Sequence, residues 1–505
     1  MDLLEVVKQR RLLLEAGVLE KLSTLQPGEA LDALFEAEEQ ASKQNLFVIS
    51  NSLVEKILAG KSSERKAEQV AFAVEKTAPA EARETGFQSA LKIQPERKFD
   101  CTGTVQDFVS HFNNRMEKLS RMLRVRASEN GLTTIIHAKS SVDRRKARIM
   151  GMVENKRQTA KGNFSFNLED KADMMKCIAS QRDAKLFSQA QDLWLDEVVA
   201  VDGFYSNGIF MVEGIIFPDV PIRPKKLADV NEDICIAFLS DMHVGSRFFL
   251  QKEFERMLEF LNGVGLEGKE AELSKSIKYV VIAGDMVDGV GVYPTQEKQL
   301  VTKNIFEQYE LLGKYLKTIP GDIQVVISPG NHDAVRDAEP QPSLPSEFVH
   351  SFTQENFHFV PNPSMVEIHG IRILMYHGAS VDALIAKSEK LGDAYDHPEK
   401  VAVELLKRRH LSVTYGENPL VPSAEDGMVI ETVPDIFHFG HVHKNAVQDY
   451  KGTLIINSGT WQSRTDYQVK QGHHPSPCLM PVYNIRTGAL KIIDFNQQQE
   501  RTDRK

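Results

Sequence analysis

Five short apolar runs in the second half of the chain each end in polar residues, and this feature restricts the fold more than any other. The runs are ICIAFLS, YVVIAG, IQVVIS, IRILMY and IFHFG, between residues 234 and 440. Helix-forming stretches separate them, and a sixth apolar run, TLIINSG, follows. Near-continuous apolar strands are typical of sheets covered on both faces, so the pattern predicts a layered α/β domain.

The residues that follow these strands are imidazoles, carboxylates and one amide: Asp241, His243, Asp285, Asp288, Asn331, His332, Asp333, His377, His441 and His443. Loops at the carboxyl ends of such strands meet at one crevice, so we expect these side chains to converge. An isolated histidine is usually structural, whereas five strand ends in series predict a site. Glycines at positions 284, 330, 378 and 440 permit sharp turns at the junctions.

This mixture of ligands, which lacks a thiolate, suits Mn²⁺, Fe or Zn²⁺ better than Ca²⁺. The ligands are too numerous for one ion, whereas two ions about 4 Å apart that share a carboxylate account for them. We therefore predict two divalent metal ions, with Mn²⁺ as the first expectation and Fe or Zn²⁺ as alternatives. Such a pair activates water and screens a phosphodiester, so a chain with net charge −9 can process a polyanion.

The rest of the chain predicts further parts. Residues 1–60 have helical periodicity, 61–100 are polar and predict a flexible linker, and 496–505 form a polar tail. An amphipathic helix over residues 104–126 precedes short strand-like runs with a hairpin signal at Ser206-Asn207-Gly208. Residues 101–222 therefore predict a helix plus a small barrel of OB type. Its basic residues either form a solvated face or follow a nucleic acid: Arg144, Arg145, Lys146, Arg148, Lys156, Arg157 and Lys161.

The four cysteines lie far apart, which favours a reducing, cytoplasmic location over a disulfide framework. No apolar run is long enough to predict a membrane segment. His438 alternates with two phenylalanines and is expected to be structural. His473 and His474 lie beside prolines in a loop and are not expected to bind metal or substrate.

The motif series D-x-H, G-D-x-x-D, G-N-H-D, H-G and G-H-x-H, over residues 233–495, resembles the calcineurin-like metallophosphoesterases. GNHD, with no arginine after GDMVD, is more similar to their nuclease branch than to the protein phosphatases, which carry GDxxDRG and GNHE. With the preceding barrel, SDMHVGSRFF, YHGAS and NSGTWQSRTDYQ resemble the small-subunit family of archaeal D-family DNA polymerases. The first hundred residues match that family only in general organisation.

The resemblance implies a two-sheet α/β sandwich and a 3′–5′ exonuclease that proofreads for a separate large polymerase subunit. The implied partners are that large subunit and single-stranded DNA or a primer 3′ end. One implied metal set is Asp241, His243 and His443; the other is Asn331, His377 and His441, with Asp285 bridging. His332 is implied as general acid or charge stabiliser, Asp333 as the residue that orients His332 by a hydrogen bond, and Asp288 as a support for the Asp285 turn.

Two other functions fit the same residues. A phosphomonoesterase or cyclic-nucleotide phosphodiesterase uses the same pair of ions, and cleavage of a small chromogenic diester distinguishes it from a nuclease. A non-catalytic polymerase scaffold suits the helices and the barrel, but it gains nothing from so many unneutralised ligands.

Overall fold

The structure is a computed structural model. It describes residues 87–127, 132–350, 352 and 354–496, and, nearer the N-terminus, residues 7, 14–23, 30, 33–35, 37, 41, 48–55 and 57. The chain divides into two compact units, residues 1–78 and 79–505. Residues 61–86 of the predicted linker and residues 497–505 of the predicted tail lie outside the described residues.

In the first unit, the described residues include helix α2 (Val18–Ser23). Val18 and Leu22 of this helix are fully buried in a small apolar cluster with Leu34 and Val54. The other residues of the predicted helical module at 1–60 are described only in part.

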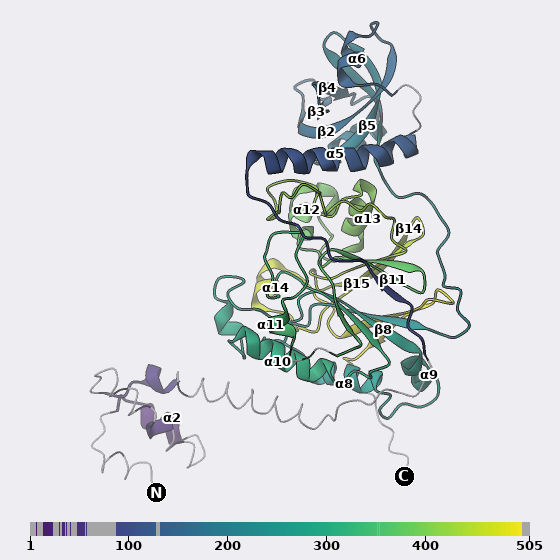
Figure 1. Cartoon of the computed structure of the whole chain (residues 1–505). Helices are drawn as coiled ribbons and strands as arrows, with labels where there is room; N and C mark the ends of the chain where they lie inside the picture. The colour runs from purple at the N-terminus through teal and green to yellow at the C-terminus, as the bar shows by residue number, and fades with distance from the viewer. Residues whose placement is uncertain are drawn as a thin grey trace. The chain divides into compact units, whose positions relative to one another are not determined.

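The second unit contains a closed five-stranded barrel in the order β2-β3-β4-β6-β5 (Figure 1). Its strands are β2 (Lys146–Gln158), β3 (Phe164–Glu169), β4 (Met174–Ala179), β5 (Val198–Ser206) and β6 (Ile209–Ile216). Short helices α6 (Ile135–Ser140) and α7 (Ala184–Gln191) pack against it. Asn207 and Gly208 both have positive φ, at 49° and 81°, so the predicted hairpin between β5 and β6 is confirmed.

Helix α5 (Val105–Ala127) forms where the sequence predicts an amphipathic helix, but its buried residues include charged ones as well as apolar ones. Val105 at its start is 80% exposed, whereas Arg115 is 1% exposed. The Arg115 guanidinium donates to the buried Asp426 carboxylate at 2.7 Å, while Leu119 and Leu123 pack against the barrel. The helix is therefore held both by the ion pair with Asp426 and by apolar packing against the barrel, and not by a single apolar stripe.

The second unit also contains two six-stranded sheets, in the orders β1-β11-β12-β13-β15-β14 and β10-β9-β8-β7-β16-β17. The first contains β1 (Leu91–Ile93), β11 (Ser364–Ile368), β12 (Ile371–Met375), β13 (Ile436–Phe439), β14 (Asn445–Tyr450) and β15 (Thr453–Ser458). The second contains β7 (Cys235–Leu239), β8 (Ile277–Ala283), β9 (Gln324–Ser328), β10 (Phe357–Phe359), β16 (Leu479–Asn484) and β17 (Leu490–Asp494).

The two sheets share one buried core, in which Ile236 and Val281 of one sheet join Ile373 and Ile456 of the other. Helices α12 (Val381–Lys387) and α13 (Glu399–Arg408) share a second apolar core with the first sheet. Figure 1 shows α8 (Gln251–Leu261), α9 (Gly268–Ser276) and α10 (Ile305–Leu316) beside the second sheet. The remaining short helices are α11 (Ser346–Val349), α14 (Asp466–Gln471), η1 (Gln296–Gln299) and η2 (Glu389–Leu391).

Strand β1 corrects the predicted linker, which was expected to extend to residue 100. Leu91 pairs with Ile368 of β11, and both Leu91 and Ile93 pack against the shared core. The alternation of two apolar residues around Lys92 is too short a pattern to stand out in a polar segment. Among the described helices, none combines the length and the apolarity needed to cross a bilayer.

Candidate metal centre

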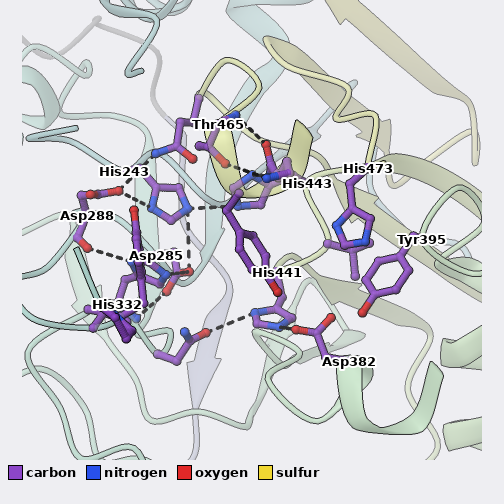
Figure 2. A pocket seen from close by; sticks show the side chains of 18 residues that line it. His243, Asp285, Asp288, His332, Asp382, Tyr395, His441, His443, Thr465 and His473 are labelled. Carbon is purple, nitrogen blue, oxygen red and sulfur yellow. Dashed lines mark hydrogen bonds and ion pairs between the residues drawn. The ribbon is translucent and has the colours of Figure 1, made fainter. Parts of the chain in front are cut away.

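All seven predicted ligands follow the ends of strands and lie close together. Five of them line one pocket, which Figure 2 shows: His243, Asp285, Asn331, His441 and His443. Asp241 and His377 are fully buried beside these five. Strands β7, β8 and β9 of one sheet lead to Asp241, His243, Asp285 and Asn331. Strands β12 and β13 of the other sheet lead to His377, His441 and His443. Because the carboxyl ends of both sets of strands point to the same side of the shared core, residues far apart in sequence become neighbours.

The first cluster contains Asp241, His243 and His443, all buried. The Nε2 atoms of His243 and His443 lie 3.0 Å apart. His443 Nε2 is also 3.4 Å from an oxygen of Asp241. Three potential donors to a cation therefore face one another across a few ångströms.

The second cluster contains Asp285, His377 and His441, with the Asn331 amide between them. His377 Nε2 lies 3.0 Å from the Asn331 side-chain oxygen and 3.2 Å from Asp285 Oδ2. His441 Nδ1 lies 3.1 Å from the same amide oxygen. Asp285 Oδ2 is also 3.8 Å from His243 Nε2, so this single oxygen faces both clusters.

Each of these imidazoles faces its cluster with one ring nitrogen. The partner of the other ring nitrogen indicates whether the ring is set up to hold a metal. Three face acceptors: His243 with Asp288 at 3.1 Å, His377 with the Ala283 carbonyl at 2.9 Å, and His441 with Asp382 at 3.0 Å. Such partners are typical of metal-binding histidines, because they fix the ring and its tautomer. His443 differs, since its Nδ1 faces the side-chain nitrogen of Gln468 at 2.9 Å.

The carboxylate and the imidazoles of the second cluster stabilise each other's charged forms. Burial disfavours the charged form of His377, but Asp285, Asp241 and the Ala283 carbonyl together outweigh burial and raise the pKa of His377 to about 10. Burial in turn opposes ionisation of Asp285, yet the neighbouring histidines hold its pKa well below the usual range. A divalent cation among the same atoms satisfies the amide, carboxylate and imidazole acceptors together, so the donor set fits a metal.

The backbone at these loop ends is unusual. Asp241, His243, Asp285, His441 and His443 all have left-handed φ, between 51° and 68°. Aspartate and histidine tolerate this region better than most residues, but strained backbone of this kind gathers at functional sites.

Two of the predicted junction glycines are needed for space. A Cβ on Gly330 would lie 2.3 Å from Asp285 Oδ1, and one on Gly440 would lie 2.3 Å from Asp241 Oδ2. Neither glycine has a positive φ, so the conformational freedom predicted for them is not the reason for glycine at these two positions. The reason is the close approach of the carboxylates, which leaves no room for a side chain. Both carboxylates are thus seated directly against the neighbouring strand ends.

His332 lies beside both clusters with one nitrogen fixed. Its Nδ1 donates to the Asp288 backbone carbonyl at 2.7 Å, which leaves Nε2 4.0 Å from Asp285 Oδ2. Its ring packs edge-on against His243, with centroids 4.7 Å apart. Burial lowers the pKa of His332, while Asp285 opposes that shift.

The predicted hydrogen bond from Asp333 to His332 is wrong. Both Asp333 oxygens are engaged elsewhere, with Oδ1 accepting from the Tyr309 hydroxyl at 3.0 Å and Oδ2 from the Gly330 N–H at 2.8 Å. Oδ2 also lies 3.4 Å from the Met286 N–H, so Asp333 supports the turn that follows Asp285.

Asp288, predicted to support that turn, instead contacts His243 with its side chain. It also orients His332 with its backbone carbonyl. The sequence motif places both carboxylates near the site, but it does not specify which neighbour each of them contacts.

The pocket over the clusters has a volume of about 460 Å³ and contains residues that the sequence reasoning missed. They are Tyr293, Asp382, Tyr395, Tyr467 and His473. His473 was interpreted as an ordinary loop residue, yet its ring stacks on Tyr395 with centroids 3.9 Å apart. No local pattern marks these residues, because they come from separate segments that only the folded chain brings together.

The sequence is similar to known polymerase subunits. A profile of the family that comprises the B subunits of DNA polymerases alpha and epsilon matches residues 236–447. The DNA polymerase II small subunit of Archaeoglobus fulgidus is 40% identical over 465 residues, covering 89% of this chain and 90% of that protein. The small subunit of Methanothermobacter thermautotrophicus is 35% identical, with coverages of 89% and 94%.

A third relative, the DNA polymerase II small subunit of Methanocaldococcus jannaschii, is 41% identical over 77% of this chain and 65% of its own length. Among solved structures, a novel archaeal phosphodiesterase overlaps 52% of this chain and 99% of its own at 13% identity. The TM-score of that overlap is 0.25, which is too low to support a conclusion.

Proposed function

This chain belongs to the family of archaeal DNA polymerase II small subunits, and from that premise we propose that it is a two-metal 3′–5′ exonuclease that proofreads for a large polymerase subunit. The observation that carries the proposal is the convergence of seven donors in two clusters around Asp285. A subunit that served only as a scaffold would not need buried ligands on strained backbone at five strand ends.

The residues of the first cluster would hold one ion, and Asn331, His377 and His441 would hold the other, with Asp285 shared between them. A bound pair supplies an acidified water and stabilises the charge that develops on phosphorus. The donor set contains imidazole, carboxylate and amide without thiolate, which suits Mn²⁺, with Fe or Zn²⁺ as alternatives.

The chain itself positions the proton transfer. His332 donates Nδ1–H to the Asp288 carbonyl, so its Nε2 is the nitrogen left to face the pocket. In the proposed reaction a water loses one proton to solvent and its oxygen bonds to phosphorus, while the bond from phosphorus to the 3′ oxygen breaks. His332, protonated on both nitrogens for this step, transfers its Nε2 proton to that oxygen and regains a proton from solvent afterwards. Two-metal sites of this kind stabilise the attacking and leaving oxygens of an in-line displacement together.

The barrel supports binding of single-stranded DNA in the proposed function. We assign it as an OB-type barrel, since it is small, closed and five-stranded. Two residues of the predicted basic set form ion pairs with acidic residues of the barrel itself. Arg148 pairs with Asp202 at 2.7 Å, and Lys146 pairs with Glu213 at 3.0 Å. The exposed basic residues available to a DNA backbone are Arg144, Arg145, Arg157 and Lys161.

The deciding experiment is a nuclease assay on the purified full chain, with and without its large subunit. A 5′-labelled single-stranded oligonucleotide with Mn²⁺ should shorten stepwise from its 3′ end. Asp285→Ala, Asn331→Ala and His443→Ala should each abolish shortening while the circular dichroism spectrum stays unchanged. A chromogenic phosphodiester assayed in parallel distinguishes a nuclease from a small-molecule esterase. Absence of DNA cleavage with every divalent ion, in both preparations, refutes the proposal.

A further inference from the structure

An aromatic pair lies in the pocket outside the donor set. Tyr395 follows η2, and His473 follows α14 directly after its C-cap, Gly472. Their rings are 3.9 Å apart between centroids and only 25° from parallel. Both side chains are half-buried and line the same cavity as the candidate ligands. Two flat rings held in register on a cavity wall are suited to stack on a third.

Asp382 connects this pair to the donor set. Its carboxylate lies 3.0 Å from His441 Nε2, on the side of that ring away from the cluster. Burial and the same carboxylate raise the pKa of Tyr395, so its phenol stays protonated at neutral pH. Burial lowers the pKa of His473. The pair therefore offers an uncharged surface next to the position of an anionic phosphate.

The pair and His332 lie on opposite sides of the pocket (Figure 2). In the proposed reaction, His332 protonates the 3′ oxygen of the departing strand, so that strand lies on the His332 side. The terminal nucleoside is attached to phosphorus through a different oxygen, its 5′ oxygen. Its base is then directed away from His332, toward the side of Tyr395 and His473.

We propose that Tyr395 and His473 form a stacking platform for the unpaired base at the 3′ end of the strand, which rests on the proposed exonuclease function. The platform binds any base, because every base has a flat π face. It selects single-stranded termini, since a paired terminal base is not free to leave its own stack. A frayed, mismatched primer end presents such a base, and a correctly paired end does not.

The cleavage experiment compares two oligonucleotides that differ only in whether the 3′-terminal nucleotide has a base or is abasic. Loss of stacking on an aromatic side chain typically corresponds to about 5- to 100-fold in affinity. We expect the wild-type chain with Mn²⁺ to prefer the terminus with a base by a factor in this range, in kcat/KM. Tyr395→Leu should reduce the preference to about twofold or less, and Tyr395→Phe should retain it because the ring remains.

A matched control is Tyr415→Leu. Tyr415, like Tyr395, is a loop tyrosine that contacts another aromatic ring. Its contact with Phe108 is edge-on rather than stacked, and Tyr415 does not line the pocket. This variant should keep the wild-type preference, and His473→Leu should lose it. Metal content measured by mass spectrometry should equal that of the wild type in all four variants. Equal cleavage of both oligonucleotides by the wild type overturns the platform and leaves the exonuclease proposal intact.

A binding experiment tests the platform even if no cleavage is found. The probe is an oligonucleotide with 2-aminopurine at its 3′ end, mixed with Asp285→Asn so that the strand stays whole. Stacking should quench its fluorescence, and adding Tyr395→Leu should remove that quenching. If quenching depends on Tyr395 while the wild type cleaves nothing, the exonuclease proposal fails and the platform stands. Quenching unchanged by Tyr395→Leu overturns the platform.

Discussion

Asp285 Oδ2 lies 3.2 Å from His377 Nε2 in the second cluster, and the same oxygen is 3.8 Å from His243 Nε2 in the first. The other oxygen, Oδ1, accepts the His332 backbone N–H at 2.9 Å, so the carboxylate cannot rotate freely. This one side chain therefore ties together strands β8 and β9 and both donor clusters. The first prediction concerns its removal.

Asp285→Asn should abolish metal-induced stabilisation. A ligand at a hundred times its Kd stabilises the native state by about 2.7 kcal/mol, so excess Mn²⁺ should raise the Tm of the wild type clearly. The variant loses the charge shared by both clusters, and Mn²⁺ should leave its Tm unchanged. Thermal unfolding with and without Mn²⁺ measures this, with exposed Asp393→Asn as the control. A variant that Mn²⁺ stabilises as strongly as the wild type contradicts a shared role for Asp285.

Metal binding should release protons and weaken as the pH falls. Burial disfavours the charged form of His377, but Asp285 and its other polar neighbours together raise the pKa of His377 to about 10. The pKa of His441 is also raised. Both rings must give up protons to a cation, so on the order of one to two protons should leave at pH 7.5. Calorimetry of Mn²⁺ binding in buffers of different ionisation enthalpy counts them. Binding that is independent of buffer and of pH between 6 and 9 argues against His377 as a ligand.

His332→Ala should leave metal binding intact while slowing cleavage. Its Nδ1 is held by a backbone carbonyl and its Nε2 faces the pocket, so the ring is positioned for proton transfer. Loss of a general acid typically lowers turnover by roughly 10²- to 10⁴-fold. Single-turnover cleavage measures the rate, and elemental analysis measures the metal. A variant that has lost an ion identifies His332 as a ligand instead.

Asp382→Ala should weaken metal binding although Asp382 is not itself one of the proposed ligands. Asp382 accepts from His441 Nε2. Burial raises the pKa of Asp382, but His441 and the Tyr395 hydroxyl outweigh burial and lower that pKa to about 2. Removing a carboxylate that orients a metal-binding histidine typically costs about 10- to 100-fold in metal affinity. Calorimetric titration with Mn²⁺ gives the two dissociation constants. Only the site that contains His441 should weaken, and equal weakening of both sites speaks against this orientation role.

Glu339→Gln should stabilise the metal-free fold at alkaline pH. The side chain is 1% exposed, and burial raises its pKa from 4.5 to about 7. Because the folded chain holds this proton more tightly than the unfolded chain, the contribution of Glu339 is greatest below pH 4.5. It is lost as the pH rises through about 7. The loss amounts to up to about 3 kcal/mol.

Glutamine keeps an oxygen that accepts the Tyr376 hydroxyl, as Glu339 does at 3.2 Å. The variant should therefore match the wild type at pH 5 and exceed it at pH 8.5, as measured by urea unfolding. If the wild type and the variant lose stability in parallel between these pH values, Glu339 is not the group responsible.

The sequence determined the strands and the residues at their ends. Apolar runs such as YVVIAG and IQVVIS are typical of buried inner strands. Asp285 follows the first directly, and Asn331 follows the second after Pro329-Gly330. The hairpin at Asn207-Gly208 was equally local, since its two positive φ angles need those residue types. Patterns of this kind depend on neighbours in the chain, so they can be interpreted without a fold.

The tertiary structure alone decided which side chains meet. Asp288 and Asp333 occupy motif positions, yet their hydrogen-bond partners differ from those predicted, because a shift of a few ångströms decides between candidates in a crowded site. Tyr395 and His473 stack although 78 positions separate them, and nothing near either one indicates the other. Long-range packing of two sheets sets such distances, and sequence spacing contains no measure of it.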